Sequence, residues 1–171
     1  MTRAMLVGML FSVALSCGGD PVHDSQVSAL GPETGVSPGP QHRPGQPCLT
    51  CHGGSGPAST QFSMAGTVFG VKDKSCPLAG VQVQLTDANR SQHSATTNDA
   101  GNFYVPLSDW APVAPVHVAL TFQMLTARMT SHIGRDGSCA DCHYEPPSPA
   151  TPGIVYMAFS AADLPAGVSC P

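Results

Sequence analysis

Two short stretches of the chain repeat one arrangement of thiols and an imidazole. The first is CLTCH, from Cys48 to His52, and the second is CADCH, from Cys139 to His143. In a Cys-x-x-Cys-His sequence the two thiols can form thioether bonds to the vinyl groups of a haem, and the histidine can bind the iron. The repeat therefore predicts two covalently attached c-type haems.

Each position in the two motifs then has a role. The thiols that would attach the haems are those of Cys48, Cys51, Cys139 and Cys142. The proximal iron ligands would be His52 and His143, one for each haem.

The sixth ligand of each iron must come from outside the motif. His42 lies six residues before Cys48, and His132 lies seven residues before Cys139. Either intervening loop is long enough to reach the far face of the haem. These histidines are candidate distal ligands, and the thioethers of Met129 and Met64 are alternatives.

Three other uses of the paired cysteines stay open. A dithiol of thioredoxin type is one, but neither copy opens a helix after a strand in a βαβ unit. The four thiols could bind one structural zinc ion, although zinc does not require a histidine directly after the second cysteine. A disulfide within each pair would close a tight loop with poor geometry. The histidine that follows both copies favours haem.

The first sixteen residues, MTRAMLVGMLFSVALS, place one arginine before an apolar run and end on a small residue. This layout predicts a secretory signal rather than a membrane span. The next stretch, VALSCGG, resembles a bacterial lipobox, in which the cysteine receives a lipid. The resemblance implies a lipid anchor at Cys17 and, because Gly follows the cysteine, a place at the outer membrane, on its periplasmic face or the cell surface. The alternative is a secreted protein without the anchor.

The count of cysteines leaves one further pair. Of the seven cysteines, four belong to the motifs and Cys17 belongs to the lipobox, so that Cys76 and Cys170 remain. In an exported protein these two would most simply form a disulfide that ties the loop after the first strand to the C-terminus, and the alternative is two unpaired or intermolecular thiols.

The charge balance excludes one class of partner. Without residues 1–16 the chain has six basic and eleven acidic side chains, a net charge of −5. Such a chain offers no basic surface for nucleic acid.

The elements that must position the motifs follow from composition and periodicity. Residues 17–47 are rich in Gly and Pro and read as a flexible tether. Residues 48–61 would form the first haem-binding loop, and residues 62–130 a β-sandwich core. Residues 131–171 would form the second haem-binding loop and a C-terminal strand.

Strand patterns dominate the central part of the chain. In GVQVQLTDA, Val81, Val83 and Leu85 alternate with polar side chains. Other strand patterns, which are separated by turn residues, cover 62–70, 92–98, 102–107, 115–122, 123–130 and 153–159. No segment shows amphipathic helical periodicity. We therefore expect an all-β fold, a small antiparallel sandwich flanked by the two motifs.

The stretch AGTVF…CPLAGVQVQLTD…ATTNDAGNFYVPL, from Ala65 to Leu107, resembles the carboxypeptidase regulatory-like, transthyretin-like sandwich. The resemblance implies an Ig-like or prealbumin-like fold and no activity by itself. A sandwich with a Cys-x-x-Cys-His motif on each side is similar to a group of bacterial exported cytochrome-like proteins. That similarity implies electron transfer with redox partner proteins of the cell envelope or with an external acceptor.

Two other classes of function can be weighed against electron transfer. A small dihaem peroxidase or reductase would need acid and base groups beside an open haem, and the sequence shows no such set, so we expect an electron carrier and not an enzyme. A binding or structural surface lipoprotein, with a sandwich module and a structural zinc site, is the alternative.

Overall fold

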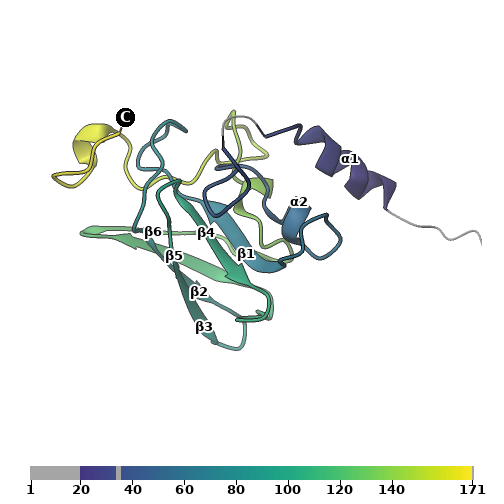
Figure 1. Ribbon diagram of the computed structural model, residues 1–171. Helices are drawn as coiled ribbons and strands as arrows, with labels where there is room; N and C mark the ends of the chain where they lie inside the picture. The colour runs from purple at the N-terminus through teal and green to yellow at the C-terminus, as the bar shows by residue number, and fades with distance from the viewer. Residues whose placement is uncertain (1–19, 34–35, 171) are drawn as a thin grey trace, which may run out of the picture.

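The computed structural model describes residues 20–33 and 36–170. The predicted signal, residues 1–16, and the predicted lipidation site, Cys17, lie outside the described residues. The described part is mostly β-structure, with six strands in two antiparallel sheets and a few short helices (Figure 1). The all-β class is thus confirmed. None of the helices in this part is long and apolar enough to cross a membrane.

The two sheets differ in size. The smaller sheet pairs β1 (Phe62–Thr67) with β4 (Asn102–Pro106). The larger sheet has the order β3-β2-β5-β6, and its strands are β2 (Gln82–Thr86), β3 (Gln92–Thr96), β5 (His117–Phe122) and β6 (Leu125–Arg128). All neighbouring strands are antiparallel.

Both sheets contribute to one hydrophobic core. In β2 the side chains of Val83 and Leu85 are fully buried while those of Gln82 and Gln84 are exposed. This confirms the predicted period-two pattern, which sets the register of a half-buried strand. The buried members of the core are Met64, Val68, Leu78, Val81, Val83, Leu85, Phe103, Val105, Val116 and Leu120. Met64, one of the alternative distal ligands, is only 1% exposed and packs in this core.

The predicted C-terminal strand, residues 153–159, does not form. This segment instead lies parallel to the residues that follow β1, where Phe69 accepts a hydrogen bond from Met157 N and donates one to Val155 O. The chain then turns between Val71 and Cys76, where Asp73 N donates to Val71 O. The last hydrogen bond between the two segments joins Ala158 N to Gly70 O, just before this turn.

The predicted tether is not structureless. Residues Pro21–Ala29 form helix α1, and the carboxylate of Asp20 accepts hydrogen bonds from Val22 N and His23 N at its start. Asp at the N-cap followed by Pro at the first helical position is a strong start signal. No side chain of α1 is buried, so the helix has no apolar face that periodicity could detect.

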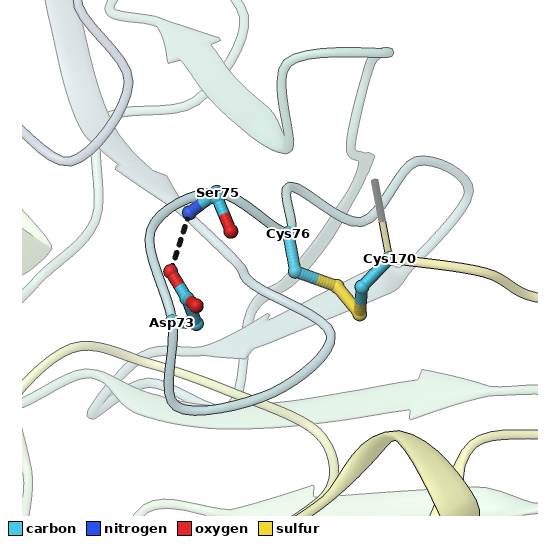
Figure 2. Close-up of a disulfide and its surroundings, with 4 residues drawn as sticks. All are labelled: Asp73, Ser75, Cys76 and Cys170. Atoms are coloured by element: carbon cyan, nitrogen blue, oxygen red, sulfur yellow. Dashed lines mark hydrogen bonds between the residues drawn. A yellow bond between two sulfur atoms is a disulfide. The ribbon is translucent and has the colours of Figure 1, made fainter.

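The disulfide predicted from the cysteine count is present. Cys76 is bonded to Cys170, 94 residues later, beside a turn in which Ser75 N donates to the Asp73 carboxylate (Figure 2). Cys76 also belongs to a small second core with Ala158 and Leu164. The bond therefore fastens the C-terminal segment to the turn that follows β1.

Replacing both disulfide residues, Cys76→Ser with Cys170→Ser, is expected to lower the free energy of unfolding by about 4 kcal/mol, because a long closed loop no longer restricts the unfolded chain. Urea unfolding followed by circular dichroism measures the change. Ser75→Ala is the control, since the hydrogen bond in that turn uses the backbone N–H. An unchanged unfolding free energy in the double variant would contradict this role of the disulfide.

Candidate functional site

The first motif lies on a short helix. Helix α2 (Leu49–His52) begins directly after Cys48, and His52 N donates to Cys48 O. The imidazole of His52 is fixed by a 2.7 Å contact between Nδ1 and the carbonyl oxygen of Thr60. Because a carbonyl can only accept a hydrogen bond, Nδ1 carries the proton and Nε2 keeps a lone pair. His52 is therefore prepared to bind a metal through Nε2.

The second motif repeats this arrangement. The 3-10 turn η1 (Cys139–Asp141) carries it, and His143 N donates to Cys139 O. Nδ1 of His143 lies 3.0 Å from the carbonyl oxygen of Gly153. A backbone carbonyl that holds Nδ1 of a ligating histidine is a recurrent feature of metal sites in proteins. Both histidines thus present Nε2 as the free ligand atom.

A cavity of about 810 Å³ lies at the first motif. Cys48, Cys51 and His52 line it, and so does the predicted distal ligand His42. The ring centroids of His42 and His52 are 5.9 Å apart. The contact that holds the His42 ring joins Nδ1 to the backbone of Gly39, which leaves its Nε2 available as well.

A second cavity of about 400 Å³ lies at the other motif. Its lining includes Cys139, Cys142 and His143, together with the distal candidates Met129 and His132. Both volumes are in the range of pockets that hold cofactors and drug-sized ligands. Each motif therefore has its own cavity, and each cavity contains the histidine proposed as the distal ligand for that motif, whereas Met64 lines neither cavity.

The segment around His42 forms a wall of the first cavity, although the sequence suggested a tether there. Gly45 N donates to the hydroxyl oxygen of Thr67 at 2.7 Å, and Asn102 Nδ2 donates to His42 O at 3.0 Å. The Thr67 hydroxyl donates in turn to the side-chain oxygen of Asn102. Thr67 ends β1 and Asn102 begins β4. These polar groups attach the segment to the smaller sheet.

Arg43 closes the same wall. Its guanidinium donates to the carbonyl oxygens of Leu30 and Gly31 and to the side-chain oxygen of Gln46. It also lies 4.0 Å from the carboxylate of Glu33. One arginine therefore holds the residues after α1 against the residues before the first motif.

Strand β1 brings the two motifs together. Helix α2 packs beside β1 (Figure 1), and Ala65 N in β1 donates to Gly137 O just before the second motif. Phe103 of β4 lines both cavities. The two cavities therefore share Phe103 in their walls.

The first thiol of each motif is buried, and burial opposes its ionisation. Burial raises the pKa of Cys48 from 9.0 to about 11, and the charge of Asp141 from the other motif acts in the same direction. Burial raises the pKa of Cys139 to about 12, with Cys48 and Cys142 adding to the effect. Redox-active dithiols depend on a thiol with a lowered pKa, and the pKa values of Cys48 and Cys139 are shifted in the opposite direction.

Two thiols and a histidine beside a cavity are the donor set that a covalently attached haem would use at each motif. Within the described ranges, no group of three or more His, Cys, Asp and Glu side chains is arranged to hold a metal ion. The four thiols Cys48, Cys51, Cys139 and Cys142 are free. The hydroxyl of Ser138, which is 3% exposed, also lines the second cavity.

Several residues of the site could not be found from motif spacing. The carbonyls of Thr60 and Gly153 are backbone groups, so no side-chain pattern marks them. The roles of Arg43 and Asn102 depend on contacts across long stretches of sequence.

The chain matches no protein-family model, and no curated protein or solved structure shows significant similarity to it.

Gly66→Ala is expected to lower the free energy of unfolding by about 1–3 kcal/mol through overpacking. A Cβ at this position would lie 2.6 Å from Cys139 Sγ, so β1 and the second motif could not pack as closely. Gly134→Ala is the matched control, because its added Cβ meets nothing within 4 Å. Urea denaturation midpoints measure both variants. Equal midpoints would mean that β1 does not hold the second motif tightly.

Proposed function

We propose that this protein is an exported electron carrier with two covalently attached c-type haems. The observation that carries the proposal is the duplicated site: each motif combines two free thiols, a histidine with a free Nε2 atom and a separate cavity. A structural zinc site would use the thiols but would give the two histidines and the two cavities no role.

The chain would hold each haem through the thiols of the motif, the proximal histidine and the walls of the cavity. The thiols of each pair would attach the porphyrin, and Nε2 of His52 or His143 would bind the iron. When bound, the haem supplies a one-electron iron couple. The chain itself fixes the orientation of each imidazole through Thr60 O or Gly153 O. Its cavity walls limit the access of water, which tunes the reduction potential.

The distal ligands differ between the two sites. At the first site His42 is the candidate, because it lines the cavity and its Nδ1 atom is already engaged by Gly39. At the second site the half-buried Met129 and the exposed His132 both line the cavity. Ligation by Met129 would give this haem a higher potential than ligation by His132.

The proximity of the sites supports electron exchange between the haems. Phe103 lines both cavities, and Ala65 N in β1, the strand beside α2, donates to Gly137 O just before the second motif. We further propose that the sandwich is of the Ig-like or prealbumin-like type. A lipid at Cys17 would place the carrier on the outer membrane, where it exchanges electrons with envelope redox proteins or with an external acceptor.

Intact mass and a pyridine haemochrome assay, on protein made with a cytochrome c maturation system, test the proposal. We expect two haems per wild-type chain. One haem is expected in Cys48→Ser/Cys51→Ser and one in Cys139→Ser/Cys142→Ser, because each thiol pair serves its own haem. Wild-type protein that contains zinc and no haem would overturn the proposal in favour of a structural or binding lipoprotein.

His42→Ala is expected to convert the first haem from low-spin to high-spin, because the iron loses its sixth ligand. The measurement is the absorption and electron paramagnetic resonance spectrum of the variant that retains only the first haem. His93→Ala, on strand β3, is the control and should leave the spectrum unchanged. A low-spin spectrum in His42→Ala would remove His42 as the ligand.

A further inference from the structure

Basic side chains are scarce in this protein, and their positions are therefore informative. The chain after residue 16 has six Lys and Arg residues in total. Two of them, Arg128 at the end of β6 and Arg135 in the loop before the second motif, line the second cavity. Both are exposed, so they lie where the cavity meets solvent.

The arginine at the first cavity is in a different situation. Arg43 is already held by Leu30, Gly31 and Gln46 and lies beside Glu33. This is the single ion pair among the described residues. Its guanidinium is therefore occupied in holding the wall of the first cavity.

Arg128 and Arg135 have no such commitment. Neither forms an ion pair with a carboxylate in the part of the chain that the structure describes. Asp136 also lines the second cavity, but it is not within ion-pair distance of either arginine. The second cavity thus has at its opening two guanidinium groups that form no ion pair within the described part of the chain.

We propose that Arg128 and Arg135 bind the carboxylate groups of the ligand in the second cavity. A guanidinium matches a carboxylate through parallel N–H donors, which a simple point charge does not provide. This inference rests on the proposed function, in which the ligand is a haem and the carboxylates are its propionates. The inference also means that the two haems are held differently, because Arg43 at the first site binds protein groups and not the ligand.

The first test is the midpoint potential of the second haem alone, in a chain with Cys48→Ser and Cys51→Ser. Adding Arg128→Gln and Arg135→Gln is expected to lower this potential, because nearby positive charge stabilises the reduced iron relative to the oxidised iron. Arg90→Gln, outside both cavities, is the matched control and should change nothing. In the chain that retains only the first haem, the arginine variants should also have no effect.

A second measurement separates carboxylate binding from a general charge effect. A chain with all four motif cysteines replaced by Ser and with His52→Ala is titrated with ferric protoporphyrin IX and with its dimethyl ester. We expect the free acid to bind about tenfold more tightly, the size of two partly exposed charge-assisted contacts. Arg128→Gln/Arg135→Gln should remove this difference.

The outcomes distinguish failure of the proposed function from failure of the inference about the two arginines. If no haem attaches at the second motif and neither porphyrin binds, both the proposed function and this inference fail. If haem attaches but the potential is unchanged by the arginine variants, and acid and ester bind equally, the inference alone is overturned.

Discussion

The backbone of β1 and of the residues that follow it is the constraint on which both candidate sites depend. One edge of β1 pairs with β4, and Ala65 on β1 also bonds to Gly137 just before the second motif. Farther along, Phe69 bonds to the segment that contains Val155 and Met157. That segment begins at Gly153, whose carbonyl orients His143. A backbone ladder therefore fixes the positions of groups that are far apart in the sequence.

The same strand also explains why the sites are neighbours. Phe62, at the start of β1, lines the first cavity, and Thr67, at its end, lines the second. The hydroxyl of Thr67 additionally holds Gly45 in the wall of the first cavity. Because β1 is paired with β4 and its second half is buried, local opening there is costly, and the strand holds the two sites at a fixed spacing. Two redox groups at a fixed short spacing suit electron exchange better than two independent sites.

The strand pattern and the disulfide could be predicted from the sequence, whereas helix α1 and the attachment of residues 39–46 could not, and each outcome has a physical cause. Val83 and Leu85 alternate with exposed Gln side chains, and a period of two is readable without any structure. The pair Cys76 and Cys170 was left over by counting, and the structure joins them. Helix α1 was missed because it buries no side chain and is marked only by its capping residues. The attachment of residues 39–46 to the sheet was missed because it depends on Asn102, about 60 positions away in the sequence.

The central claim is that each motif presents a histidine whose Nδ1 is held by a backbone carbonyl and whose Nε2 is free for iron. A crystal structure of the matured protein tests it most directly. We expect a haem in each cavity, with iron bonded to Nε2 of His52 and of His143. Thr60 O should still accept from Nδ1 of His52, and Gly153 O from Nδ1 of His143. One metal ion shared by the four motif thiols, or iron bound through Nδ1, would contradict it.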